Sequence, residues 1–178
     1  MFALTPRLVL RPGWPEEAPE LAAAINHYDV VRRLSRVPWP YGLADAEGFL
    51  ALPCSAETPR FQIYDRTDGH RLIGGIGIDM DGPYGGPEFG YWLTPSAWNR
   101  GYMTEAGRAV VAIARDTLRL PQLQSGHWVD NPASGAVLRK LGFVPTGVVE
   151  LRPCLAEKKD QPCATYTLAL APAARIAA

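Results

Sequence analysis

The sequence predicts an α/β (α+β) domain built on a mixed, mostly antiparallel central sheet flanked by helices. In the first half, short strand-like segments are joined by tight turns, which indicates antiparallel hairpins. In the second half, a strand-like segment, a long amphipathic helix and another strand follow one another. That order is typical of a crossover between parallel strands, so we expect both kinds of pairing in one sheet.

The length and composition fit one domain over residues 1–178, with 171–178 as a trailing end. Eighteen basic and eighteen acidic side chains cancel, which argues against nucleic acid or an anionic membrane as partners. The apolar runs are shorter than the roughly 20 residues that span a bilayer, and the N-terminus lacks a signal-peptide pattern. Cys54, Cys154 and Cys163 have no metal-ligand spacing. We therefore expect a cytoplasmic, metal-free monomer or homodimer.

The first half alternates strand-like and helix-like segments. Leu8–Arg11 is predicted as the first strand, and Pro15–Ile25 as a helix whose acidic first turn suits the helix dipole. Leu43–Pro53 is a second, shorter helix. The strands Phe61–Arg66 and Arg71–Met80 are joined by "TDGH", whose Asp-Gly pair is a strong hairpin signal.

In the second half, a strand at Glu88–Leu93 leads into the longest helical pattern. Apolar residues recur at three- and four-residue intervals from Met103 to Leu118, and Pro121 ends the pattern. The remaining elements are predicted as a strand, a helix and two closing strands: Leu123–Val129, Pro132–Leu141, Phe143–Leu151 and Ala164–Leu170.

Gly101 stands at the start of that long helix, in "PSAWNRGYMTEAGRAVVAIARDTLRL". The first N–H groups of a helix have no intrahelical partner, and the helix dipole adds positive charge there. A glycine at this point allows a sharp turn and a close approach to an anion such as a phosphate. The alternative is that Gly101 only eases the turn from strand to helix.

The segment "FGYWLTPSAWNRGYMTEA" resembles the acetyl-CoA-binding motif of the GNAT acetyltransferase superfamily, in its RimJ/RimL-like form. In that family a Gln/Arg-x-x-Gly-x-Gly/Ala loop precedes the main helix, and Trp98 to Met103 match it here. Trp98 replaces the usual Gln/Arg, as is common in this branch, and Met103 replaces a small residue that contributes mainly its N–H. "DNPASGAVLRKLGF", "TPRLVLRP" and "PWPYGLADAEGFL" also resemble that branch, in the same order along nearly the whole chain.

This resemblance implies the GNAT fold, with acetyl-CoA in a cleft between splayed strands 4 and 5 of the family's sheet and with no metal. The diphosphate would lie on the amides from Asn99 to Thr104, and an N–H near Leu93 or Thr94 would polarise the thioester carbonyl. The implied cofactor-binding residues are Leu93, Thr94, Trp98, Asn99, Arg100, Gly101, Tyr102, Met103, Thr104, Asn131 and Ser134. The side chain of Glu105, in the same helical turn, would repel a phosphate and should point elsewhere.

Glu88 and Ser134 are the candidate catalytic residues by the same resemblance. Glu88 opens the strand before the loop, and a pKa raised by burial would let it accept the proton of the amine. Ser134 would protonate the leaving thiolate. The alternatives are a solvated glutamate at a strand end and an ordinary serine in a first helical turn. Asn131 is a good N-cap in its own right, and capping is compatible with a contact to the cofactor.

The acceptor implied by the resemblance is a protein N-terminal α-amine. The same branch also covers small-molecule amines, including polyamines and antibiotics, so these stay open. So does a non-catalytic acyl-CoA-binding sensor. The sequence contains neither a P-loop nor a Rossmann glycine motif, which argues against other nucleotide-binding folds.

Overall fold

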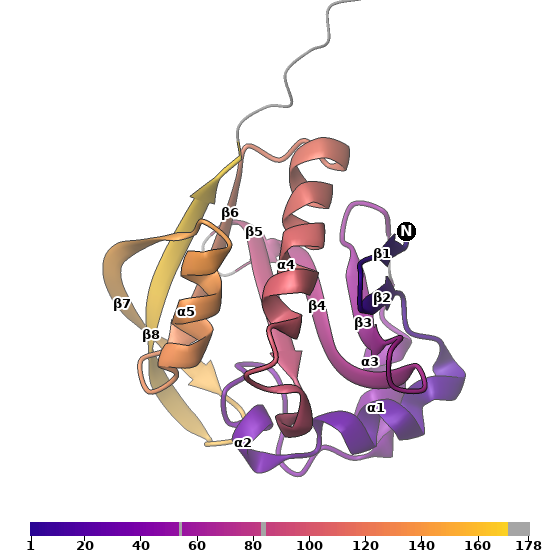
Figure 1. Cartoon of the computed structure of the whole chain (residues 1–178). Coiled ribbons are helices and arrows are strands. Elements are labelled where there is room, and N and C mark those ends of the chain that lie inside the picture. The colour runs from indigo at the N-terminus through magenta and orange to yellow at the C-terminus, as the bar shows by residue number, and fades with distance from the viewer. Residues whose placement is uncertain (54, 83–84, 171–178) are drawn as a thin grey trace, which may run out of the picture.

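One mixed sheet runs through the protein and carries α4 and α5 on one face (Figure 1). The structure, a computed structural model, describes residues 1–53, 55–82 and 85–170. Eight strands follow the order β1-β2-β3-β4-β5-β6-β8-β7, and the pair β5–β6 is parallel while the others are antiparallel. The strands are β1 (Ala3–Leu4), β2 (Leu8–Arg11), β3 (Arg60–Asp65), β4 (Arg71–Gly82), β5 (Gly86–Leu93), β6 (Gln122–Trp128), β7 (Val144–Cys154) and β8 (Lys159–Ala169). The predicted fold class is confirmed.

The helices pack on the sheet through two hydrophobic clusters. The helices are η1 (Pro15–Glu17), α1 (Ala18–Ile25), α2 (Tyr28–Val31), α3 (Leu43–Leu50), η2 (Pro95–Ala97), α4 (Tyr102–Ala112), η3 (Ile113–Thr117) and α5 (Pro132–Lys140). The larger cluster joins α4 and α5 to buried strand residues that include Ile63. The second joins α1, α2 and α3 to Tyr64. Because successive side chains of a strand point to opposite faces, the two clusters lie on opposite faces of the sheet.

The predicted elements are present, with differences at short segments and at element ends. The strand β1 and the helix α2 were missed, because two and four residues are too short to show a period. The long helix ends as the π-helical η3, in which the N–H of Leu118 donates to the carbonyl of Ile113 at 3.0 Å. The second predicted helix ends at Leu50 rather than Pro53. Cys54 and the trailing residues 171–178 lie outside the described residues.

The parallel strands β5 and β6 pair at one position, Glu88 with Gln124. Each strand continues beyond it, to Leu93 and to Trp128, without further pairing between the two. A gap therefore opens in the sheet beyond Glu88 and widens the space between the β5–α4 and β6–α5 connections. β5 and β6 here are the strands that the family counts as its fourth and fifth, and the predicted splay is present.

No helix within residues 1–53, 55–82 and 85–170 is long and apolar enough to cross a membrane. Within the same residues, no cluster of three or more histidine, cysteine, aspartate or glutamate side chains has the arrangement of a metal site.

Candidate active site

The loop between β5 and α4 turns the chain so that its amides point outward from the helix. Gly101 is the N-cap of α4 and has φ +78°, a left-handed conformation that glycine adopts without strain. Asn99 is also left-handed, with φ +59°. These two left-handed residues lie shortly before Tyr102, the first residue of α4.

The N–H groups from Asn99 to Thr104 have no hydrogen-bond acceptor among the residues that the structure describes. The next N–H along, that of Glu105, donates to the carbonyl of Gly101 at 3.1 Å and begins the helical pattern. Successive unpaired amides at a helix N-terminus are a binding site for a diphosphate. Tyr102 and Met103 bury their side chains, with 1% and 5% exposed, so they offer this site their main chain only.

Arg7, in the turn between β1 and β2, hydrogen-bonds to this loop and to the first turn of α4. Its Nη1 donates to the carbonyl of Arg100 at 3.0 Å, and its Nε donates to Glu105 at 2.7 Å. The other oxygen of Glu105 accepts from the hydroxyl of Thr5 at 2.6 Å and from the N–H of Arg7 at 2.9 Å. The carboxylate is thus engaged away from the unpaired amides, as expected. Sequence reasoning missed the role of Arg7.

The edge of β5 that faces the gap carries main-chain groups of alternate residues. The N–H of Thr94 donates to Ile73 of β4 at 2.9 Å, so it is not available to a thioester carbonyl. Hydrogen bonding alternates along an antiparallel strand, which turns the N–H of Leu93 and of Tyr91 toward the gap. The hydroxyl of Ser125 in β6 donates to the carbonyl of Phe89 at 2.8 Å, in agreement with this alternation. Leu93 therefore suits the oxyanion role, and Thr94 does not.

Asn131 and Ser134 meet at the start of α5, on the opposite side of the gap. The side-chain oxygen of Asn131 accepts from the N–H of Ser134 at 3.4 Å, so the predicted N-cap is confirmed. Tyr91 reaches from β5 to the same place: its hydroxyl donates to the carbonyl of Ser134 at 3.0 Å and lies 2.8 Å from the serine Oγ. Nothing in the sequence around Tyr91 predicts this contact.

Burial raises the pKa of Tyr91 far above its ordinary value, against the opposing hydrogen bond to Ser134. The phenol therefore keeps its proton at neutral pH. A second pair lies on the same side of the sheet, where Nε2 of His127 is 3.4 Å from the hydroxyl of Tyr166. That hydroxyl also accepts from Nη1 of Arg139 at 3.2 Å.

Glu88 lies where the gap begins, and its side chain is 15% exposed. Its Oε1 is 2.8 Å from Nη1 of Arg152 in β7, and its Oε2 is 3.5 Å from Nη2 of Arg36. Arg36 also pairs with Asp79 of β4 at 2.8 Å. Burial raises the pKa of Glu88 above its ordinary value; Arg36 opposes the shift and Asp79 adds to it. Glu88 is therefore not a solvated strand-end residue.

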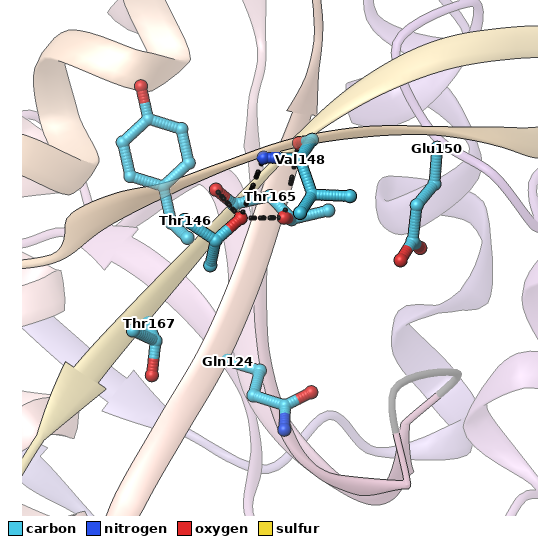
Figure 2. A pocket seen from close by; sticks show the side chains of 7 residues that line it. Gln124, Thr146, Val148, Glu150, Thr165 and Thr167 are labelled. Atoms are coloured by element: carbon cyan, nitrogen blue, oxygen red, sulfur yellow. Dashed lines mark hydrogen bonds between the residues drawn. The ribbon is translucent and has the colours of Figure 1, made fainter.

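A cavity of about 330 Å³ is lined by Gln124 of β6, among other residues (Figure 2). Gln124 is the residue that pairs with Glu88 of β5. Glu150, in the cavity wall, is paired with Cys163 of β8 and lies two positions before Arg152 on β7, so both side chains share a face of the sheet. Thr146 and Thr165, which both line the cavity, hydrogen-bond to each other (Figure 2). The lining residues are Gln124, Thr146, Val148, Glu150, Thr165, Tyr166 and Thr167.

Comparison with known proteins decides the family. Residues 7–144 match the Acetyltransferase (GNAT) domain family. The chain belongs to the GNAT acetyltransferases. It is 30% identical over 156 residues to the uncharacterized N-acetyltransferase YoaA of Bacillus subtilis (strain 168), a match that covers 82% of this chain and 84% of YoaA.

Solved structures share the fold at low sequence identity. A GNAT-family acetyltransferase from Bacillus anthracis superposes with a TM-score of 0.79 at 19% identity, over 95% of this chain and 98% of that one. RimL, a ribosomal L7/L12 alpha-N-protein acetyltransferase solved with coenzyme A, superposes with a TM-score of 0.77 at 16% identity, over 96% and 98%. As a member of this family, the chain is an acetyl-CoA-dependent N-acetyltransferase.

Proposed function

We propose that this GNAT enzyme acetylates the N-terminal α-amine of a protein. The observation that carries the cofactor part is the run of unpartnered amides from Asn99 to Thr104 beside the gap between β5 and β6. Such amides fit the diphosphate of acetyl-CoA, and the gap fits an extended arm that leads from it toward Glu88. The residues around this arm are Leu93, Trp98, Asn131 and Ser134.

Acetyl-CoA supplies an acetyl thioester, and the residues of the chain handle protons and charge. Glu88 accepts a proton from the incoming ammonium, either directly or through water, and the free amine forms the new C–N bond as the C–S bond breaks. The Leu93 N–H stabilises the negative charge that develops on the carbonyl oxygen. The hydroxyl of Ser134, hydrogen-bonded to Tyr91, supplies the proton that the thiolate takes up. The acetylated nitrogen loses its second proton to solvent, and solvent restores the serine hydroxyl.

A peptide acceptor is favoured over a polyamine by the charges at the mouth of the site. A polyamine needs several carboxylates that lack a cationic partner. Here Asp79 and Glu88 already pair with Arg36 and Arg152. The neighbouring cavity carries threonine hydroxyls and the Gln124 amide, groups that can hydrogen-bond a peptide main chain. The likeness of fold to RimL points the same way.

The test is the release of free thiol from acetyl-CoA with four acceptors. These are a peptide with a free serine N-terminus, the same peptide N-formylated, the formylated peptide with an internal lysine, and spermidine. We expect turnover with the free N-terminus alone. Turnover with spermidine alone would transfer the proposal to small amines. Tight binding of coenzyme A with no thiol release from any of the four would indicate a sensor.

A further inference from the structure

Arg33, just after α2, bridges the two sides of the gap. Its Nη1 donates to the side-chain oxygen of Asn131 at 3.1 Å, at the start of α5. The carbon of its guanidinium lies 5.4 Å from the centre of the Trp98 ring, in the loop before α4. A side chain that follows α2 thus contacts both connections between which the cofactor is proposed to lie.

The hydrogen bond from Arg33 to Asn131 determines which group of the Asn131 side-chain amide is available to a ligand. The side-chain oxygen accepts from Arg33 and from the N–H of Ser134, and both groups are donors that cannot accept. The amide oxygen must therefore point at them, and the NH₂ group must point away. No acceptor for this NH₂ group is found among residues 1–53, 55–82 and 85–170.

The position of Arg33 is a poor one for stability. No carboxylate lies within ion-pair distance of its guanidinium in the described part of the chain. Its Nε is buried and has no acceptor among the same residues. A buried donor without a partner destabilises the folded state, so a purely structural role does not explain this arginine. Departures of this kind are expected at functional sites.

We propose that Arg33 is a positioning residue for acetyl-CoA. It holds the Asn131 amide so that the NH₂ group donates to a carbonyl of the cofactor's arm. This inference rests on the proposed cofactor site and adds to it a residue from outside both motifs. It also makes cofactor binding depend on the placement of α2.

Arg32 provides a matched control. It too ties the end of α2 to the β6–α5 connection, through bonds of 2.9 and 3.0 Å from its guanidinium to Asp130. Asp130 is the neighbour of Asn131, and its side chain is 55% exposed. If tethering of α2 were what matters, loss of either arginine would have the same effect.

The experiment measures the dissociation constant of coenzyme A by titration calorimetry and the melting temperature by calorimetric scans. The variants are Arg33→Met, Arg32→Met, Asn131→Ala and the double variant Arg33→Met/Asn131→Ala. We expect about tenfold weaker binding for Arg33→Met with no loss of melting temperature, and unchanged binding for Arg32→Met. The double variant should bind as Asn131→Ala does, because Arg33 acts through Asn131.

Each of the other outcomes would overturn a specific part of the proposal for Arg33. Equal weakening by both arginine variants would mean that the tether matters and not the amide. Additive losses in the double variant would mean that Arg33 contacts the cofactor itself. Unchanged binding by Arg33→Met, while the wild type binds coenzyme A, would sink this inference alone. If the wild type fails to bind coenzyme A, the proposed function falls as well.

Discussion

The hydroxyl of Tyr102 donates to the carboxylate of Asp65 at 2.5 Å, joining the first residue of α4 to the last residue of β3. Both residues are buried, with 1% and 0% exposed. The second oxygen of Asp65 accepts from the N–H and the hydroxyl of Thr67, at 2.9 and 2.6 Å. The orientation of the unpaired amides is thus fixed by a bond to β3, which lies two positions from β5 in the sheet order.

Tyr102→Phe should destabilise the protein by about 1–3 kcal/mol, because Asp65 would lose a donor in a buried site. Urea unfolding measures this, and coenzyme A binding should weaken in parallel. Tyr28→Phe is the matched control, since the hydroxyl of the exposed Tyr28 makes a bond of the same length to Glu157. Its effect should be much smaller; equal effects would show that the buried bond does not anchor α4.

Gly101→Val should weaken coenzyme A binding far more than it lowers stability, because it strains the turn that presents the amides. Gly69→Val separates strain from binding. Gly69 also has a positive φ, +62°, with nothing within 4 Å of an added Cβ, but lies in the β3–β4 turn. We expect similar losses of stability, of about 1 kcal/mol or more, and a binding defect only for Gly101→Val. A binding defect in both would mean that global strain causes it.

Turnover should fall as the pH decreases through the raised pKa of Glu88, because the protonated carboxyl cannot accept a proton. Glu88→Gln should slow turnover at every pH and leave coenzyme A binding intact. Arg36→Gln should move the acidic limb to higher pH, since Arg36 lowers this pKa, and Asp79→Asn should move it to lower pH. Profiles of turnover against pH that shift in the same direction for both variants would exclude Glu88 as the base.

Gly90→Val should block the site without unfolding the protein. Gly90 lies in the part of β5 that has parted from β6, on the same face as Glu88, and an added Cβ would meet nothing within 4 Å. Valine also suits a strand, so the melting temperature should hold. Turnover should fall at least about tenfold, and an unchanged rate would place the reaction away from this stretch of β5.

Acid should release the support beneath the amide loop. Burial acts to raise the pKa of Glu105, but the hydrogen bonds from Thr5 and Arg7 outweigh it and hold the pKa below the ordinary 4.5. A lowered pKa in the folded state contributes stability above the unfolded value and loses it as pH falls through the folded one. Glu105→Gln should therefore flatten the dependence of unfolding free energy on pH below about 4.5, and an unchanged slope would contradict this role.

The sequence predicted the parts of the site that local patterns encode. Gly101 before a helical period, and Asn131 followed by proline, are short-range signals with a physical cause, and both stand where expected. Glu88 was predicted as the opening residue of a strand, and in the structure its side chain is 15% exposed. These features depend on neighbours a few positions apart.

Contacts between distant segments carry no such signal. Arg7 and Glu105, or Arg33 and Asn131, are 98 positions apart, and nothing in either local stretch specifies the partner. The same holds for Arg36, whose pairing with Glu88 depends on how the chain after α2 crosses the sheet. The Thr94 amide depends on the strand register. Its hydrogen bond to β4 follows from the alternation along an antiparallel strand, but the sequence does not give the register that decides which residues bond.

The single rung between Glu88 and Gln124 divides the sheet into two blocks, β1 to β5 and β6 to β8, that share little main-chain bonding. A molecule bound in that opening would contact both blocks and restrain their motion relative to each other. Amide hydrogen exchange in β6 and β8 should then slow markedly when coenzyme A is present, even at residues that never touch it.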